Sequence, residues 1–164
     1  MKNNVNKKSS SLKAEGSTHF GFKTVKAHDK AKMVKSVFDN VASQYDLMND
    51  LMSLGIHRLW KSTLIDYLDP QPDTKLIDVG GGTGDIAFKF LKSGGGEVII
   101  CDINHEMVNI GRDRAINRGI LNGIDWINGD AEELPMPKNV FDAYTSAFCI
   151  RNVTHIESAL SEAH

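Results

Sequence analysis

The sequence contains little cysteine and proline, and it has no long apolar segment. Its 164 residues include two cysteines and four prolines, which excludes a disulfide scaffold and a collagen-like protein. Cys101 and Cys149 lie in or just after apolar runs, where we expect buried free thiols rather than a disulfide. No apolar stretch approaches the ~18 residues of a membrane-spanning helix. The six histidines are too scattered to ligate a metal. The composition is that of a soluble globular domain.

The charge is distributed unevenly along the chain. Residues 1–36 hold nine lysines and two acidic residues, a net of +7, whereas residues 37–164 hold 10 basic and 19 acidic residues, a net of −9. The total of −2 gives no reason to expect nucleic-acid binding. We expect residues 1–28 to form a basic, disordered tail, with weak attraction to anionic lipid as the alternative. This segment lacks the apolar region of a secretory signal and the arginines of a transit peptide, so a cytoplasmic location is expected.

Hydrophobic periodicity predicts two helices followed by alternating strands and helices. Apolar residues recur at helical spacing from Val34 to Met48 and again from Leu59 to Leu68, so residues 29–72 read as an N-terminal helical region. From residue 73 the pattern predicts strands over 75–79, 97–102, 124–129 and 140–148, and helices over 84–93 and 105–118. Apolar strands that alternate with helices indicate a mostly parallel sheet covered on both faces. We therefore expect a Rossmann-like, doubly wound α/β domain over residues 73–164.

A glycine-rich turn joins the first strand to its helix and indicates a nucleotide-type cofactor. Gly80, Gly82 and Gly84 would let the backbone approach a ligand closely. The spacing, with Asp102 at the end of the next strand, is compatible with a nicotinamide dinucleotide. However, Asp78 would repel a pyrophosphate bound at the helix N-terminus. S-adenosylmethionine carries a cationic amino group and a sulfonium instead, so an acidic site favours it. In both cases Asp102 can accept hydrogen bonds from ribose hydroxyls.

Longer motifs resemble those of one enzyme family. The run YDLMNDLMSLGIHRLWK (45–61) is similar to the signature of the ubiquinone/menaquinone biosynthesis C-methyltransferases. The segments FGFKTV (20–25), GGGTGDIA (80–87), CDIN (101–104) and Arg151-Asn152-Val153 match the same family. The resemblance covers residues 20–164 and implies the class I methyltransferase fold. It also implies methyl transfer from S-adenosylmethionine to a ring carbon of a polyprenylated hydroquinone, a precursor of ubiquinone, menaquinone or both.

The resemblance also implies which residues form the site. The cofactor contacts carried over from the family are Gly80, Gly82, Thr83, Asp102, Asp130 and Ala131. The quinol contacts are Tyr45, Arg151 and Asn152. Arginine stabilises a developing phenolate, asparagine orients a ring oxygen, and tyrosine bonds to it or stacks on the ring. Each has a structural alternative, which is core packing for Tyr45, capping of a carbonyl end for Arg151 and a turn for Asn152. We interpret His57 and Trp60 as structural.

Two departures from the family pattern affect these expectations. Ala147-Phe148-Cys149 replaces the family's Ser-Phe-Gly, which removes one hydroxyl and adds a side chain that could crowd the cofactor site. The family's sheet has three strands beyond the four seen here, which would need roughly 80–90 further residues. We therefore expect the chain to be a fragment of the enzyme, truncated at its C-terminus and inactive when isolated.

Other functions are compatible with parts of the pattern. A methyltransferase acting on another small molecule would use the N-terminal helices only as a lid. A non-catalytic subunit would keep the fold to bind other quinone-biosynthesis proteins. A nicotinamide dehydrogenase is the most distant alternative. A basic N-terminal segment beside a quinol site would also favour peripheral contact with the inner face of the membrane. Oligomeric state has no signal in the sequence.

Overall fold

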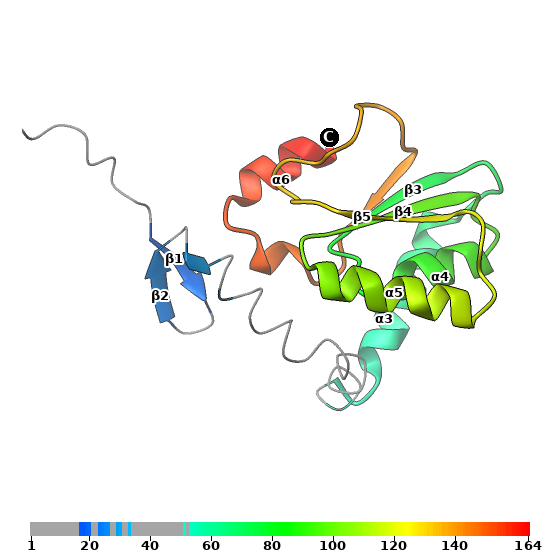
Figure 1. Ribbon diagram of the computed structural model, residues 1–164, viewed down its shortest axis with the longest axis horizontal. Coiled ribbons are helices and arrows are strands. Elements are labelled where there is room, and N and C mark those ends of the chain that lie inside the picture. The colour runs from blue at the N-terminus through cyan, green and yellow to red at the C-terminus, as the bar shows by residue number, and fades with distance from the viewer. Residues whose placement is uncertain (1–16, 21–22, 27–28, 31–32, 34–50, 52) are drawn as a thin grey trace, which may run out of the picture.

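The computed structural model describes residues 17–20, 23–26, 29–30, 33, 51 and 53–164 (Figure 1). An antiparallel hairpin of β1 (Ser17–Phe20) and β2 (Lys23–Lys26) comes first. The elements that follow are α3 (Ile56–Leu68), β3 (Lys75–Val79), α4 (Asp85–Lys92), β4 (Glu97–Asp102), α5 (His105–Asn117), β5 (Ile124–Asn128), β6 (Ala143–Thr145), the 3-10 turn η2 (Ile150–Asn152) and α6 (Ile156–Ala163).

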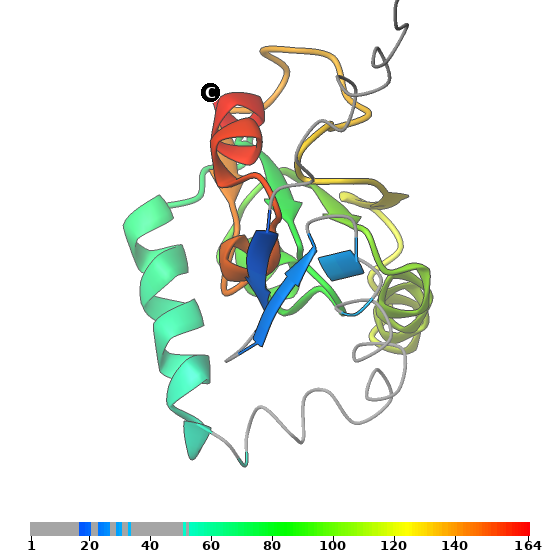
Figure 2. The ribbon, with the colours of Figure 1, turned by 90° about the vertical axis from the view of Figure 1, so that its left-hand side faces the viewer.

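Strands β3 to β6 form one parallel sheet in the order β5-β4-β3-β6. The chain enters the sheet at β3, moves outward through α4, β4, α5 and β5, and then returns to place β6 on the other side of β3. Helices α3, α4 and α5 lie below the sheet in Figure 1, whereas α6 lies above it, and Figure 2 shows the same separation from the side. This reversal of direction at β3 is the mark of a doubly wound sheet. The expected Rossmann-like α/β fold is confirmed.

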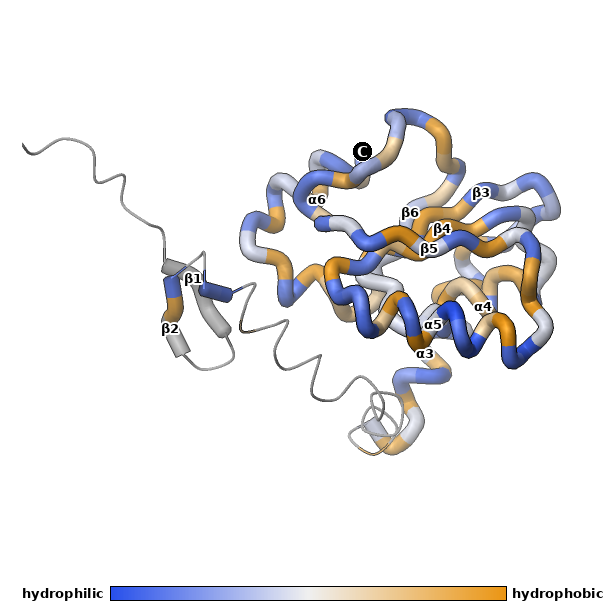
Figure 3. The backbone as a smooth tube through the Cα atoms, viewed as in Figure 1, coloured by the Kyte–Doolittle hydropathy of each residue, from blue (hydrophilic) through white to orange (hydrophobic). Residues whose placement is uncertain are grey.

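The two faces of the sheet are covered differently. Leu76 and Ile100 point to the helical face, where they join Phe90, Val108 and the other buried residues of the larger core. Ile77 and Val79 point to the opposite face and pack against residues 131–144. Successive strand residues alternate between faces, so this continuous apolar pattern buries both sides. The apolar colouring of the strands in Figure 3 shows the same pattern.

Several element boundaries differ from the sequence prediction. Strand β6 spans Ala143–Thr145 rather than 140–148, because these three residues are the ones that pair with Leu76, Ile77 and Asp78 of β3. Ser17–Phe20 and Lys23–Lys26 pair as antiparallel strands inside the segment 1–28, which the sequence predicts to be a basic, disordered tail. The helix predicted to run from Val34 to Met48 lies outside the described residues. The division into segments 1–28, 29–72 and 73–164 otherwise stays a prediction.

None of the helices in the described part of the chain is long and apolar enough to cross a membrane. Both cysteines are free thiols, Cys101 buried and Cys149 partly exposed.

Candidate cofactor and substrate site

The glycine-rich loop after β3 is shaped by left-handed backbone angles and close packing. Gly80, Gly82 and Gly84 have φ values of 68°, 56° and 87°, which residues with a Cβ adopt only with strain. Gly81 has an ordinary φ, but a Cβ there would lie 2.6 Å from Asp78 Oδ2 and 2.8 Å from Ile100 Cγ2. The loop therefore lies directly on the end of the sheet.

Asp78 is a fully buried carboxyl group beneath this loop. Its Oδ1 accepts a hydrogen bond of 2.8 Å from the hydroxyl of Thr145, its register partner on β6. Its Oδ2 is buried and has no hydrogen-bond partner. Burial raises the pKa of Asp78 from 3.8 to about 7, although the Thr145 bond and the charge of Lys61 oppose the shift. The structure thus holds an acidic group with spare acceptor capacity under the loop.

Asp102 fixes the loop from the neighbouring strand. Its Oδ2 accepts from the Gly82 N–H at 2.9 Å, and its Oδ1 accepts from the Asn104 N–H at 2.8 Å. Burial raises the pKa of Asp102, and these two backbone bonds oppose the rise. Each carboxylate oxygen can accept more than one hydrogen bond, so Asp102 retains capacity for a ligand's hydroxyl groups.

The turn after β5 brings Asp130 and Ala131 to the same edge. Gly129 N–H donates to the Asp102 carbonyl, which ties the ends of β4 and β5 together. Asp130 Oδ1 accepts from the Glu132 N–H and leaves the carboxylate exposed. Ala131 packs against the sheet face that carries Ile77 and Val79. A short apolar side chain therefore lies beside an exposed acid at this turn.

Cys149 lies against the glycine loop. A Cβ on Gly80 would be 2.2 Å from Cys149 Sγ, so the two backbones approach as closely as the thiol allows. Burial raises the pKa of Cys149 to about 11, and the charges of Asp102, Asp78 and Asp130 add to the rise. A side chain at position 149 therefore lies against Gly80 of the loop, and its effect on cofactor binding stays a prediction.

Arg151 and Asn152 lie in η2, which begins at Ile150 directly after Cys149. The Asn152 N–H donates to the Cys149 carbonyl at 2.8 Å, which closes the turn beside the loop. Arg151 is exposed and Asn152 is partly exposed. Phe148, before the turn, has a φ of 64° and its ring lies 5.9 Å from the ring of Trp60 on α3. A strained residue in such a place is common at functional sites.

Two charged side chains fix the segment that follows η2. The Lys30 ammonium, on a residue that is 6% exposed, donates to the Val153 carbonyl at 2.9 Å. Glu132 Oε1 accepts from the N–H groups of Thr154 and His155, and its Oε2 lies 2.6 Å from His155 Nδ1. These hydrogen bonds lower the pKa of Glu132, although partial burial opposes them. Residues 153–155, here called the strap, are therefore held from both sides.

Most of the predicted site residues converge on one edge of the sheet. The carboxyl ends of parallel strands meet at the same edge, so the residues after β3, β4, β5 and β6 are neighbours. These are Gly80, Gly82, Thr83, Asp102, Asp130, Ala131, Arg151 and Asn152. Thr83 is buried and its hydroxyl is bonded to Arg114 of α5. Tyr45, the third residue predicted to contact substrate, lies outside the described residues.

Sequence reasoning overlooked other contributors. Thr145 and Glu132 belong to no sequence motif. The role of Thr145 follows from the register of β6 with β3, and the role of Glu132 follows from its hydrogen bonds to the strap. His57 is buried and bonded to Ser53 Oγ at 2.7 Å, as a structural residue would be. Trp60, also interpreted as structural, is 58% exposed and contacts Phe148 beside the site. Over the described ranges, no cluster of histidine, cysteine and acidic residues is arranged to hold a metal ion.

Comparison with known proteins identifies the family of the chain. Residues 24–164 match the model of the ubiE/COQ5 methyltransferase family. The chain belongs to the ubiE/COQ5 methyltransferase family. A curated family member, the ubiquinone/menaquinone biosynthesis C-methyltransferase UbiE of Cereibacter sphaeroides (strain ATCC 17029 / ATH 2.4.9), is 53% identical over 148 residues, which are 90% of this chain and 59% of the relative. The human 2-methoxy-6-polyprenyl-1,4-benzoquinol methylase, mitochondrial, is 45% identical and is covered over 57% of its length. The chain thus spans about three fifths of the ubiE/COQ5 relatives it matches.

Solved structures agree on the fold of this ubiE/COQ5 family member. The YcgJ protein of Bacillus subtilis matches with a TM-score of 0.59 and 25% identity, over 62% of this chain and 43% of that one. An S-adenosylmethionine-dependent methyltransferase of Methanococcus maripaludis, described as putative, matches with a TM-score of 0.62 and 16% identity, over 74% and 56%. Structural similarity at these identities supports the class I methyltransferase fold alone.

Proposed function

We propose that this chain binds S-adenosylmethionine at the carboxyl edge of its sheet, and that the enzyme methylates a ring carbon of a polyprenylated hydroquinone. The observation that carries the cofactor assignment is the buried Asp78 carboxyl, whose Oδ2 has no partner. A buried acid beneath a ligand-binding loop favours a cationic ligand and disfavours a pyrophosphate. S-adenosylmethionine has a cationic sulfonium and amino group and no phosphate, so it fits this loop better than a dinucleotide does.

The neighbouring residues suit the rest of the same cofactor. Asp102 already accepts two backbone hydrogen bonds and has lone pairs left for ribose hydroxyls. Asp130 offers an exposed carboxylate for a polar adenine edge, and Ala131 offers a short apolar side chain beside it. Gly80 and Gly82 give the close backbone approach that a cofactor over this edge requires. Thr83 supports the loop through Arg114 of α5.

The proposed chemistry is the alkylation of an activated aromatic ring. Bound S-adenosylmethionine supplies a methyl group on a positively charged sulfur. A ring carbon becomes nucleophilic when a ring hydroxyl, with a phenolic pKa near ~10, loses its proton. Arg151, exposed beside Cys149, stabilises the resulting phenolate oxygen, and Asn152 orients it. The ring carbon would take the methyl group as the bond between that methyl and the cofactor sulfur breaks, S-adenosylhomocysteine would leave as the thioether, and loss of the ring proton would make the ring aromatic again. Tyr45 is the third proposed contact with the ring.

Relatives support the substrate class. Proteins at 45–53% identity carry names that refer to ubiquinone, menaquinone or a polyprenyl benzoquinol. The exposed rings of Trp60 and Phe148 add an apolar surface next to Arg151 and Asn152, which suits a prenylated ring.

Calorimetry at several pH values tests the cofactor assignment. Because a cationic ligand favours ionised Asp78, affinity for S-adenosylmethionine should rise about tenfold from pH 6 to pH 8, on either side of a pKa of about 7. Asp78→Asn should flatten this dependence, and NAD⁺ should not bind. Equal binding of NAD⁺ would restore the dehydrogenase alternative, and absence of cofactor binding would leave the non-catalytic one.

The quinones of a deletion strain test the substrate. A strain without the gene should accumulate a quinol precursor that lacks one ring methyl group, and the intact gene should restore the methylated quinone. An unchanged quinone content would favour a methyltransferase acting on another small molecule.

We propose further that the basic N-terminal segment brings a cytoplasmic enzyme to the inner face of the membrane, where a prenylated substrate resides. Residues 1–36 carry a net charge of +7, which anionic lipids attract. Deletion of residues 1–19 should weaken sedimentation with vesicles that contain phosphatidylglycerol, and unchanged sedimentation would remove this proposal. Other quinone-biosynthesis proteins are the proposed protein partners.

A further inference from the structure

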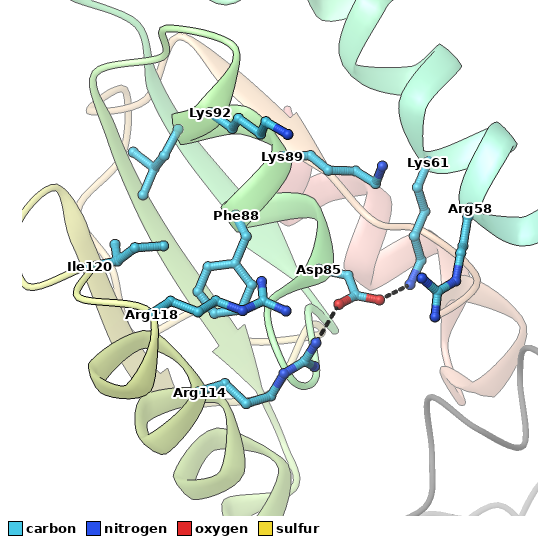
Figure 4. A pocket seen from close by; sticks show the side chains of 10 residues that line it. Arg58, Lys61, Asp85, Phe88, Lys89, Lys92, Arg114, Arg118 and Ile120 are labelled. Carbon is cyan, nitrogen blue, oxygen red and sulfur yellow. Dashed lines mark hydrogen bonds and ion pairs between the residues drawn. The ribbon is translucent and has the colours of Figure 1, made fainter.

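A groove on the helical face of the molecule concentrates positive charge. It has a volume of about 620 Å³ and lies between α3, α4 and the end of α5 (Figure 4). Its walls include six basic side chains and one acid, Asp85. The basic residues are Arg58 and Lys61 from α3, Lys89 and Lys92 from α4, and Arg114 and Arg118 from α5 and its C-terminus.

This concentration contrasts with the rest of the chain. Residues 37–164 hold ten basic and nineteen acidic residues. Six of those ten basic residues line the groove, whereas one of the nineteen acidic residues does. Because the segment carries a net charge of −9, a random distribution of its charged residues would place more acidic than basic side chains in such a cavity. The groove is therefore a local field of opposite sign to its surroundings.

Part of this charge is used within the fold. Lys61 and Arg114 both bind Asp85, at 2.9 and 3.0 Å, and together they lower the pKa of its carboxyl although burial opposes them. Lys89 donates to Ser62 Oγ at 2.8 Å, which joins α4 to α3. These contacts account for the one acid in the groove and leave a net charge of +5 among its lining residues.

The remaining charge is presented to solvent. The Arg118 guanidinium lies over the Phe88 ring, with Cζ 4.4 Å from the ring centroid, a stacking that fixes the group while its N–H edges point outward. Within the described stretches, the side chains of Arg118 and Lys92 form no hydrogen bond or ion pair, and both residues are exposed. Phe88, Leu91 and Ile120 supply apolar walls between them.

We propose that this groove is a binding site for a phosphate-bearing anion. Phosphate oxygens can accept from several cations at once, and arginine forks and lysine ammonium groups from three helices surround this cavity. Its volume is in the range of small-molecule sites rather than of a flat protein interface. A phospholipid headgroup and a soluble polyphosphate share the recognised chemistry. The groove is distinct from the carboxyl edge of the sheet, because Asp102 and Arg151 are not among its lining residues, although Arg114 joins it to Thr83 of the glycine-rich loop.

The test compares two double variants of the complete chain. Lys92→Gln/Arg118→Gln removes two charges from the groove, and Lys75→Gln/Lys138→Gln removes the same charge elsewhere. Lys75 and Lys138 are exposed and lie outside the groove. All variants keep the basic N-terminal segment, so attraction by that segment is the same in each. Circular dichroism checks that each variant is folded.

Two probes separate the sources of the phosphate. Affinity for sodium tripolyphosphate is measured by calorimetry, and affinity for phosphatidylcholine vesicles with and without phosphatidic acid is measured by sedimentation. The groove variant should bind at least one probe roughly 25-fold more weakly, because each of its two lost cations should weaken binding to an anionic surface about fivefold. The control variant should match the unaltered chain.

Each outcome bears on the proposal. Weaker binding of tripolyphosphate alone supports a soluble ligand, weaker binding of acidic vesicles alone supports a lipid headgroup, and weaker binding of both supports phosphate recognition in either setting. Equal effects of the two double variants would show attraction by net charge only and would overturn the proposal. Absence of any effect of the groove variant would do the same.

Discussion

Asp78→Asn should stabilise the protein progressively as the pH is raised. Asp78 is fully buried, and its pKa is raised from 3.8 to about 7 because burial disfavours the charged carboxylate. Between these two values the folded protein binds more protons than the unfolded chain, so the contribution of Asp78 to stability falls as pH rises and is lost above pH 7. Asparagine has the same shape but cannot ionise, so the variant lacks this loss.

The expected magnitude follows from the size of the shift. A difference of about 3 pKa units is equivalent to about 4 kcal/mol at high pH, at ~1.4 kcal/mol per unit. At pH 4.5 the loss is only about 1 kcal/mol, because this pH is less than one unit above 3.8, the pKa at which the unfolded carboxyl ionises. The amide adds a buried N–H group where Oδ2 has no partner, at about 1–3 kcal/mol, but this term does not vary with pH. The difference in unfolding free energy should therefore shift by about 3 kcal/mol in favour of the variant between pH 4.5 and 8.5.

Urea unfolding followed by circular dichroism measures this difference at each pH. Asp66→Asn, at an exposed position on α3, is the control for removal of one carboxylate. A difference for Asp78→Asn that stays constant within about 1 kcal/mol from pH 4.5 to 8.5 would refute the reasoning, because it would mean that Asp78 is equally ionised in the folded and unfolded chains.

Three further substitutions test the packing around the site. Gly111→Ala places a methyl group 2.1 Å from the Trp126 ring and should lower the unfolding free energy by about 1–3 kcal/mol, measured in urea. Gly80→Ala adds backbone strain in the left-handed region and a clash with Cys149, so it should lower the unfolding free energy by about 2–4 kcal/mol. Addition of Cys149→Gly should relieve the clash but not the strain. The melting temperature of the double variant should therefore lie between those of Gly80→Ala and the unaltered protein. Glu132→Ala removes three hydrogen bonds to the strap and should lower stability by about 1–3 kcal/mol at neutral pH. Because the pKa of Glu132 is lowered in the folded protein, this effect should disappear as the pH falls through the acidic range, and a constant effect at low pH would argue against the carboxylate's role.

The regular elements of the fold could be predicted from sequence because each has a strong local cause. Strand β3 is an unbroken apolar run, and its observed bounds are those predicted. Helix α5 begins at Asn104, whose side chain accepts from the Met107 N–H, and closes before Gly119 with its left-handed angle. These signals depend on a few neighbouring residues, so they can be recognised in the sequence without knowledge of the tertiary structure.

The features that sequence patterns miss depend on contacts between distant residues. The apolar run from Val140 to Phe148 predicts a long strand, but β6 covers only the three residues that pair with β3. The pairing of Asp78 with Thr145 depends on the register of β6, which no local pattern specifies. The groove on the helical face likewise combines charges from three helices, each of which alone resembles an ordinary solvated surface.

The candidate site is partly predictable because its motifs follow strands. Parallel strands bring their carboxyl ends together, so the order of strands and motifs along the chain is enough to assign Asp102, Asp130 and Arg151 to one place. The roles of these residues stay predictions, as does that of Tyr45.

The anchoring of the strap has a consequence for how the protein folds. The hydrogen bond from Lys30 to the Val153 carbonyl joins residues separated by 123 positions, and Glu132 reaches the same short segment from the preceding loop. Long-range contacts of this kind form slowly, because the chain between them must first be ordered. The β3–β4–β5 unit, whose strands pair in sequence order, can assemble earlier from local crossovers. We therefore expect a refolding chain to form its central sheet first and to position Arg151 and Asn152 last. Recovery of ligand binding should then lag behind recovery of secondary structure.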